Sequence, residues 1–383
     1  MPAVRTSHAG SLPRPERLTS LLAQLARGES VDTDRLRAAT DDAVRDVIAR
    51  QIAAGLDIVN DGEQGRESFF TYVQHRMTGF APGGDIVPRR WRDVDDFPGF
   101  AEIRRAQRSA RDQVSLVRPP QAIGAVSYAD TTAVDEDCAR LLGALSSHHG
   151  VSGFMTSASP GIVAAAMANR HYPDDDAYLD AVGAALGVEY RRIVDAGLLL
   201  QIDAPDLAME RHGRFAERST GEFLSFVDRV IDVTNQALSG IDPAMVRLHV
   251  CWGNYGGPHT HDIPLTDLLP HLYRANVGGL LLSGANPRHE HEYKEFVSQP
   301  LPEHWQLATG VIDTTTNYVE HPEVVADRIE RVVGAIGDPA RVVACTDCGF
   351  DTSAGFGSVA GDVAWAKLDS LVEGARLVGQ RVG

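Results

Sequence analysis

Short apolar runs recur along the chain, and each ends in glycine or polar residues. Uninterrupted apolar runs of this kind are typical of strands buried on both faces of a parallel sheet. We expect eight such strands, at Ala3–Thr6, Leu56–Val59, Val151–Met155, Leu198–Ile202, Val246–Val250, Gly279–Leu282, Leu307–Ile312 and Arg341–Ala344.

Between most of these runs the apolar residues follow a helical period. Asp174–Asp195 and Glu323–Val333 each place their apolar residues on one face of a helix. Eight strands interleaved with helices predict an α/β chain that forms one (β/α)8 TIM barrel over residues 1–383. In such barrels the reactive groups gather at the C-terminal ends of the strands, where the unusual polar residues of this chain also fall.

One stretch, from about residue 73 to residue 145, breaks this rhythm. It contains Pro82, Pro88, Arg89-Arg90-Trp91 and a further apolar run at Ala122–Val126. We expect a long excursion after the second strand, passing over the barrel mouth and containing one or two extra strands. A lid and an ornament of the rim are both consistent with this pattern.

Composition narrows the classes of partner. The formal net charge of −16 disfavours nucleic acids and anionic membranes. No apolar run approaches the roughly 20 residues that cross a bilayer. Four unevenly spaced cysteines in 383 residues argue for a reducing, cytoplasmic compartment and against a disulfide framework.

His249-Val250-Cys251 is the most informative motif. Residues two apart on a strand point the same way, so the imidazole and the thiol can reach one metal ion. Cys348 would supply a third ligand from a distant strand, and three ligands with an open position describe a catalytic zinc. The plainer interpretation is a buried histidine with inert core cysteines. We expect Cys345 to pack in the core, and we assign Cys138 no role.

Five motifs in matching order carry a family resemblance over essentially the whole chain. They are His8–Pro13 (HAGSLP), Asp61–Glu63 (DGE), Gln201–Pro205 (QIDAP), His249–Cys251 (HVC) and Asp347–Gly349 (DCG). Together they resemble the C-terminal catalytic barrel of cobalamin-independent methionine synthase and its single-barrel relatives, which include the epoxyalkane:coenzyme M transferases.

This resemblance implies roles for particular residues. His249, Cys251 and Cys348 would bind Zn²⁺, and Ser11, Glu63 and Asp203 would hold the carboxylate and amino group of homocysteine. The plainer interpretation of the two acids is that strand-end carboxylates cap the following helices.

Two family positions are changed. Ser283 stands where methionine synthase has a glutamate as fourth zinc ligand; Glu290 and Glu292 are either substitutes for it or the polar first turn of a helix. Thr315 stands where that enzyme has a histidine that helps protonate the departing folate. Threonine has no useful pKa for that task, which argues against methyl-folate as the donor.

The expected activity is that of a zinc-dependent S-alkyltransferase acting on a small-molecule thiol and an electrophilic alkyl donor. The donor is an epoxide, a corrinoid-bound methyl or another activated alkyl group. Epoxide opening needs a proton, for which the candidates are Tyr255, His259, His261, Tyr318, His321 and His8, although each also suits a rim or cap position.

The choice of thiol rests on charge. Glu63 and Asp203 favour an amino-bearing thiol such as homocysteine, whereas Arg14, Arg66 and Arg288 favour a sulfonate thiol such as coenzyme M. Arg66 would also serve simply to neutralise Glu63. Two other classes compete: a metal-free barrel resembling uroporphyrinogen decarboxylase, and a non-catalytic protein with four-ligand structural zinc.

Overall fold

A computed structural model describes residues 4–83, 91–108 and 119–382; Pro88, Arg89 and Arg90 of the expected excursion lie outside these ranges. Eight parallel strands form one sheet in the order β1-β10-β9-β8-β7-β6-β5-β2. They are β1 (Arg5–Thr6), β2 (Ile58–Val59), β5 (Ser152–Ala158), β6 (Leu199–Asp203), β7 (Val246–Val250), β8 (Gly279–Leu282), β9 (Gln306–Ile312) and β10 (Val342–Thr346). All eight expected strands are therefore present, and β7 and β8 have the expected bounds.

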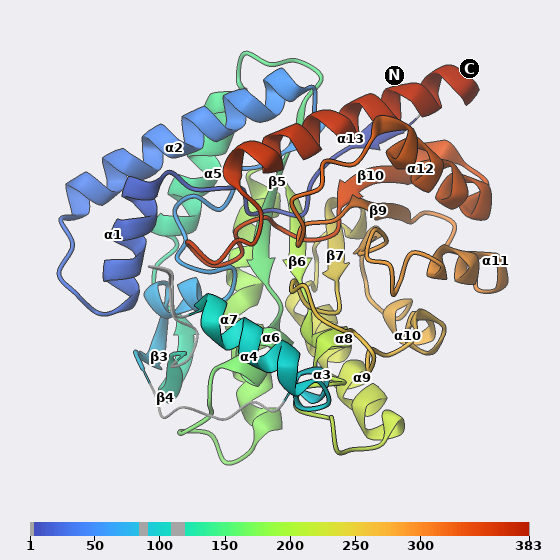
Figure 1. The fold of residues 1–383 in the computed structure, drawn as a ribbon. Helices are drawn as coiled ribbons and strands as arrows, with labels where there is room; N and C mark the ends of the chain where they lie inside the picture. The colour runs from blue at the N-terminus through green and yellow to red at the C-terminus, as the bar shows by residue number, and fades with distance from the viewer. Residues whose placement is uncertain (1–3, 84–90, 109–118, 383) are drawn as a thin grey trace.

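The sheet curls into a nearly closed barrel, which confirms the predicted (β/α)8 architecture (Figure 1). Its two end strands are joined through a side chain. The Asp57 carboxylate, just before β2, accepts hydrogen bonds from the Thr6 backbone N–H at 2.8 Å and the Thr6 hydroxyl at 2.9 Å. The end strands β1 and β2 are thus held together by a side-chain clasp.

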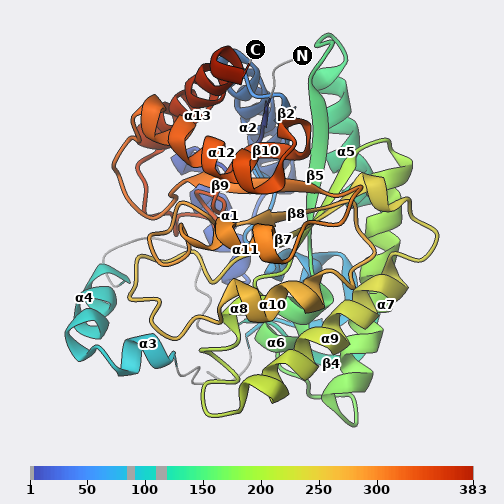
Figure 2. The same ribbon diagram turned by 90° about the vertical axis from the view of Figure 1, so that its right-hand side faces the viewer.

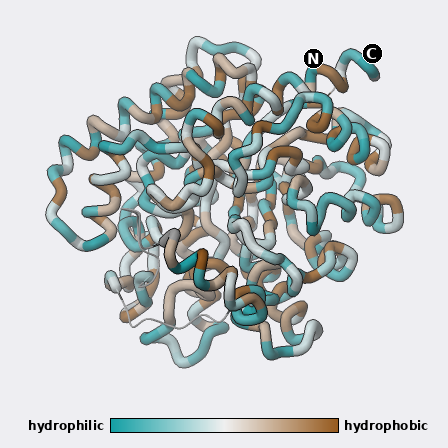
Figure 3. The backbone as a smooth tube through the Cα atoms, viewed as in Figure 1, coloured by the Kyte–Doolittle hydropathy of each residue, from teal (hydrophilic) through white to brown (hydrophobic). Residues whose placement is uncertain are grey.

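Helices surround the barrel, and hydrophobic and hydrophilic residues alternate along them (Figure 3). The helices at Asp174–Asp195 and Glu323–Val333 are confirmed as α7 and α12. The ring includes α1 (Glu16–Ala26), α2 (Thr33–Ala54), α6 (Pro160–Ala166), α7 (Asp175–Asp195), α8 (Asp206–Met209), α9 (Thr220–Ala237), α10 (Leu265–Leu272), α11 (Glu295–Ser298), α12 (Pro322–Ile336) and α13 (Gly361–Val382). Short 3₁₀ turns are η1 (Thr71–His75), η2 (Pro243–Met245), η3 (Glu292–Lys294) and η4 (Pro339–Arg341).

The segment between β2 and β5 contains an antiparallel pair, β3 (Met77–Ala81) and β4 (Gln121–Tyr128). The apolar run at Ala122–Val126 lies within β4. Two helices of this segment, α3 (Arg92–Asp95) and α4 (Pro98–Arg108), stand apart from the ring in Figure 2. The third, α5 (Thr132–Leu145), contacts α2 and α7, so it occupies a place in the helical ring.

Glu189 of α7 fastens this segment to the barrel. Its buried carboxylate accepts hydrogen bonds from Tyr72, from Tyr128 of β4 at 2.5 Å and from Ser157 of β5 at 2.7 Å, and it pairs with Arg76 at 3.0 Å. Burial would raise the pKa of Glu189, but Arg76 and the other donors outweigh it and lower that pKa to about 2. A permanently charged carboxylate therefore joins β4, β5 and α7.

The barrel interior is apolar around Phe154, Leu281 and Cys345. Cys345 is fully buried, as the sequence indicated, and Cys138 is buried in α5. Within the described parts of the chain, none of the helices combines the length and apolar character needed to cross a membrane.

Candidate active site

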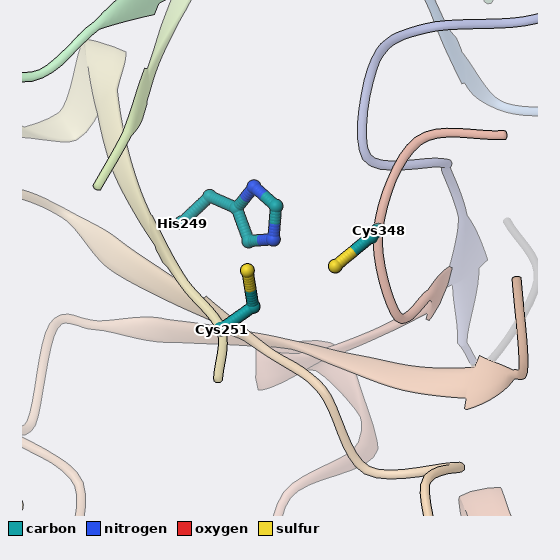
Figure 4. A group of neighbouring side chains, drawn as sticks. All are labelled: His249, Cys251 and Cys348. Atoms are coloured by element: carbon teal, nitrogen blue, oxygen red, sulfur yellow. The ribbon is translucent and has the colours of Figure 1, made fainter. Parts of the chain in front are cut away.

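His249, Cys251 and Cys348 converge at the C-terminal end of the barrel. His249 lies on β7, Cys251 follows it directly, and Cys348 lies in the loop after β10. One nitrogen of His249 and the two sulfur atoms all lie within 4.8 Å of one another, and the three residues are buried. Figure 4 shows the imidazole ring and both sulfurs directed into a common space.

Asp203 fixes the orientation of the His249 ring. The two residues are partners across the β6–β7 pairing, and Asp203 Oδ1 lies 2.8 Å from His249 Nδ1. The other ring nitrogen, Nε2, is buried and has no hydrogen-bond partner among the described residues. A carboxylate behind one imidazole nitrogen and an unused nitrogen in front is the arrangement found in metal-binding histidines.

The electrostatics of the three residues favour a negative sulfur. Burial lowers the pKa of His249, but interactions with Asp203 and Cys251 outweigh it and raise that pKa to about 10. The pKa of Cys251 falls well below 9, first because of Cys348 and then because of His249. The directions of these shifts favour a thiolate beside an imidazolium, a charge pattern that suits replacement of protons by a dication.

Ser283 lies beside this group. Its hydroxyl donates to the Asp347 carbonyl at 3.1 Å and lies 3.9 Å from the Cys348 sulfur. The Asp347 carboxylate accepts the backbone N–H groups of residues 284–286 at 2.8–2.9 Å. A Cβ at Gly310 would lie 2.0 Å from Asp347 Oδ1, so glycine is needed there. These contacts lock the loop carrying Ser283 to the loop carrying Cys348.

Neither glutamate proposed as a substitute ligand belongs to this group. Glu290 accepts hydrogen bonds from Arg328 and Arg331 on α12. Glu292 accepts the Leu265 N–H at 2.8 Å. The hypothesis that one of them replaces the missing zinc ligand is therefore wrong.

Glu63 and Arg66 meet at Thr156 of β5. The Thr156 hydroxyl donates to Glu63 Oε1 at 3.0 Å and accepts from Arg66 Nη1 at 3.1 Å, and its carbonyl accepts from the same Nη1 at 2.8 Å. Glu63 Oε2 and both Nε and Nη2 of Arg66 are buried without a hydrogen-bond partner in the described ranges. One carboxylate oxygen and one edge of a guanidinium thus make no hydrogen bond within the described ranges.

Glu63 is also strained and electrostatically perturbed. Its φ is 54°, in the left-handed region, which costs a non-glycine residue about 1–3 kcal/mol and is often found at functional sites. Burial, followed by repulsion from Asp203, raises its pKa to about 7. A nearby cation would therefore interact strongly with this side chain.

Ser11 packs directly on the loop that carries Cys348. The Ser11 carbonyl accepts the Phe350 N–H at 2.8 Å, and its hydroxyl accepts the Asp351 N–H at 3.3 Å. A Cβ at Gly349 would lie 2.0 Å from the Ser11 hydroxyl oxygen. Glycine after Cys348 thus permits the close approach of Ser11.

His8 is not placed to donate a proton at the mouth, and this expectation is corrected. Its Nε2 lies 2.7 Å from the Gln51 amide oxygen, and its Nδ1 accepts the Gly10 N–H at 3.3 Å. Burial lowers the pKa of His8 to about 3. Both nitrogens are in use, and the ring is neutral at physiological pH.

Thr315 and Tyr255 are each bound to an aspartate. The Thr315 hydroxyl donates to Asp313 at 2.8 Å, and the Tyr255 hydroxyl donates to Asp93 of α3 at 2.6 Å. Burial and then Asp93 raise the pKa of Tyr255 above its usual 10. Tyr255 therefore keeps its proton and connects α3 to the loop after β7.

Three further proton-donor candidates, Tyr318, His321 and His261, lie at the rim, whereas His259 is buried. Tyr318 is 81% exposed, and His321 caps α12 by accepting the Glu323 N–H. His261 pairs with Asp96 at 2.5 Å.

Two basic residues that favoured a sulfonate thiol have structural contacts. Arg14 donates to Asp351 and to the carbonyls of Glu63 and Arg66. Arg288 donates from Nε to the His259 carbonyl. Of the three arginines, Arg66 is the one with two buried nitrogens, Nε and Nη2, that have no hydrogen-bond partner among the described residues.

Sequence reasoning missed several polar residues of the site. Asn254, in the segment after Cys251, donates to the Gly349 carbonyl and accepts from Thr314. Asp206 is fully buried against Ser159, and burial raises its pKa to about 7. Both follow strand ends, which was a usable signal. The contact of Arg247 with Gln201 had no signal in the sequence.

The chain is similar, over nearly its whole length, to proteins named methionine synthase. It is 24% identical over 381 residues to a protein named methionine synthase from Sulfurisphaera tokodaii, covering 99% of this chain and 93% of the relative. The corresponding protein from Saccharolobus solfataricus is 25% identical over 381 residues, with coverage of 99% and 96%. No family model matches the chain.

A solved structure has the same fold. The B12-independent methionine synthase from Shewanella sp. W3-18-1, in complex with selenomethionine, matches with a TM-score of 0.71 at 22% identity, covering 99% of this chain and 98% of that one. These comparisons confirm the barrel fold and the family resemblance predicted from the five motifs.

Proposed function

We propose that this chain, a homologue of the B12-independent methionine synthases over its whole length, is a zinc-dependent transferase that alkylates a small thiol. The observation that carries the proposal is the convergence of the unpartnered His249 Nε2 with the sulfurs of Cys251 and Cys348. The coarser conclusion, a methionine synthase-type transferase, rests on the relatives alone.

The residues present fit a zinc ion. One imidazole and two thiolates are preferred zinc ligands, and three protein ligands leave a position for substrate. Asp203 behind His249 supplies the outer hydrogen bond that orients the ring. Zinc held there would stabilise the thiolate form of a substrate thiol at neutral pH.

The two unpartnered groups near Thr156 favour an amino-acid thiol. Glu63 Oε2 suits an ammonium group, and the Nε–Nη2 edge of Arg66 suits a carboxylate in bidentate geometry. Homocysteine carries both charges, whereas a sulfonate thiol would satisfy Arg66 alone. We therefore favour a homocysteine-type thiol, with Ser11 and Asp203 completing its surroundings.

Alkyl transfer to sulfur needs a bond to form and a bond to break. The sulfur lone pair attacks the donor carbon, and the donor's leaving group departs with the bonding electrons. Thr315, bound to Asp313, offers no titratable proton to a departing folate. The proposed donor is therefore an activated alkyl group other than methyl-folate.

Epoxide opening by a sulfonate thiol is the second candidate. The available edge of Arg66 favours it, because a sulfonate presents several acceptor oxygens to such an edge. In that reaction the thiolate opens the ring and the new alkoxide takes up a proton. The buried, unpaired oxygen of Glu63 counts against a ligand that carries only negative charge.

Zinc K-edge absorption on the purified chain tests the proposal. Adding homocysteine should raise the sulfur count at zinc from two to three, while coenzyme M should leave it unchanged. Glu63→Gln should weaken homocysteine binding without changing the zinc content, and Glu303→Gln, at an exposed position, should match the unchanged chain.

The other possible results of this experiment distinguish the competing functions. A third sulfur with coenzyme M alone would replace the first candidate by the second. Protein that binds no zinc, or zinc whose edge neither thiol changes, would contradict the transferase proposal. Absence of zinc would favour the metal-free decarboxylase class, and four protein ligands with no response to thiol would favour structural zinc.

A further inference from the structure

A second group of metal-binding side chains lies outside the site described above. His259, Asp262 and His289 place one ligand atom each within 4.8 Å of the others. His259 and Asp262 belong to the loop between β7 and α10, and His289 to the loop after β8. All three side chains are almost completely buried.

The hydrogen bonds of the His259 and His289 rings determine which ring nitrogens carry hydrogen. His259 Nε2 lies 3.0 Å from the Tyr255 carbonyl oxygen, and His289 Nδ1 lies 2.7 Å from Glu292 Oε2. Both partners are acceptors, so these nitrogens carry the ring hydrogens. A neutral imidazole has only one N–H, and its second nitrogen then presents a lone pair.

Both of those second nitrogens face the same carboxylate oxygen. Asp262 Oδ2 lies 2.8 Å from His259 Nδ1 and 2.7 Å from His289 Nε2. Two lone pairs against one anionic oxygen repel unless positive charge lies between them. Two protons, one on each ring, would supply it, and so would one divalent ion.

Each of the three side chains has an outer partner. The Tyr255 carbonyl holds His259, Glu292 holds His289, and His212 Nδ1 holds the other oxygen of Asp262 at 2.8 Å. Such outer hydrogen bonds fix the tautomer and direction of metal ligands. The nitrogens directed at Asp262 are the ones that an ion would bind.

The backbone of His259 supplies an independent observation. Among the described residues, only Glu63 and His259 combine a positive φ with a side chain, and that of His259 is 53°. Strained backbone of this kind persists where the surroundings hold a residue for a function. Here the residue with the strained backbone is one whose ring lies in the cluster.

From this geometry we infer that His259, Asp262 and His289 form a second binding site for a divalent transition-metal ion of the zinc class. Two imidazole nitrogens and one carboxylate oxygen form a ligand set that zinc and cobalt accept, with a position left for water. The ion replaces two protons, so the charge of the cluster is unchanged. Ligand atoms around such an ion stand ~3.0–3.4 Å apart, so Asp262 would move by about half an ångström.

This site would stabilise the rim of the barrel. It joins the loop after β7 to the loop after β8. Asp93 of α3 accepts hydrogen bonds from the Thr260 N–H at 3.1 Å and the His261 N–H at 3.2 Å. The ion would therefore also steady the attachment of α3. The inference does not depend on the proposed transferase activity.

Zinc content after dialysis of the full chain against buffered zinc tests the inference. We expect two ions per chain, one in Cys251→Ser/Cys348→Ser and one in His289→Gln. His261→Gln, whose ring instead pairs with Asp96, should retain two. With cobalt, the thiolate charge-transfer band should disappear in the cysteine variant and persist in His289→Gln.

The alternative, two imidazolium rings paired with Asp262 and Glu292, predicts a different result. One ion in the unchanged chain and none in the cysteine variant would overturn the inference, as would two ions retained in His289→Gln. The cysteine variant leaves the cluster untouched, so it decides the matter even if His289→Gln does not fold. If the cysteine variant keeps one ion and His289→Gln binds none, the second site stands and only the first site is rejected.

Discussion

Arg247 orients the amide of Gln201 inside the barrel. Arg247 Nε donates to Gln201 Oε1 at 2.7 Å, so the Gln201 NH₂ group must point the other way, where it donates to Asp203 Oδ1 at 2.7 Å. Asp203 Oδ1 also lies 2.8 Å from His249 Nδ1. The guanidinium thus determines, through two intermediate side chains, which way the candidate zinc ligand points.

We expect Arg247→Met to weaken zinc binding by about 10-fold or more, since outer hydrogen bonds contribute 10–100-fold to metal affinity. Without the guanidinium, the Gln201 amide can turn and present its oxygen to Asp203. Competition with a chromophoric chelator measures the change. Arg5→Met, whose guanidinium binds Gln306, is the matched control. Equal affinities in the two variants would remove Arg247 from the set of positioning residues.

Substitutions of Cys345 and Cys348, the two cysteines of the C-x-x-C sequence, should have different effects on zinc affinity and on stability. Cys348→Ser should lower zinc affinity by more than about 100-fold, because a hydroxyl replaces a thiolate ligand. Cys345→Ala should retain full zinc content and lose only about 1–2 kcal/mol of stability, because its sulfur is buried in the barrel core. Chelator competition and urea unfolding measure the two effects. Loss of zinc from Cys345→Ala would contradict the assignment.

The strands of the barrel could be predicted because their apolar runs are short and uninterrupted. The runs at Val246–Val250 and Gly279–Leu282 coincide with β7 and β8. The clasp between β1 and β2 could not be predicted, because the Asp57–Thr6 contact joins residues 51 positions apart. Nothing in the local pattern around Asp57 distinguishes it from an exposed acid.

The candidate site was likewise only partly predictable from the sequence. His249 and Cys251 could be paired from their spacing on a strand, and motif order added Cys348. The packing of His8 against Gln51 could not be seen, because a strand-end histidine suits either the mouth or the core. The second cluster was also missed: His259 was considered alone as a proton donor, whereas Asp262 lies three residues further along the same loop and His289 lies in another loop.

The raised pKa of Glu63 predicts a pH dependence of stability in zinc-free protein. Its folded-state pKa is about 7, because of burial and Asp203, and its unfolded value is about 4.3. Between these values the folded state binds more protons, so this carboxyl makes the free energy of unfolding fall as pH rises, by up to about 3 kcal/mol. Urea titrations from about pH 4.5 to 7.5 should show that Glu63→Gln lacks this decline and that exposed Glu303→Gln keeps it. Parallel curves for all three proteins would refute the assigned shift.

Glu189 predicts the opposite dependence. Its folded-state pKa is lowered to about 2, chiefly by Arg76 against the opposing effect of burial, so its stabilisation is present above the unfolded value of about 4.3 and is lost as pH falls toward 2. Glu189→Gln should cost about 3 kcal/mol at neutral pH, because it leaves Arg76 without this buried partner. Asp176→Asn, which removes an exposed pair with Arg229, should cost under about 1 kcal/mol. Urea unfolding should show that the difference in stability between Glu189→Gln and the unchanged chain narrows as pH falls below about 4.

Because Glu189 also holds Tyr128, hydrogen exchange in β4 should accelerate in Glu189→Gln and remain unchanged in Asp176→Asn. Unchanged exchange in β4 would mean that the excursion is attached to the barrel by other contacts.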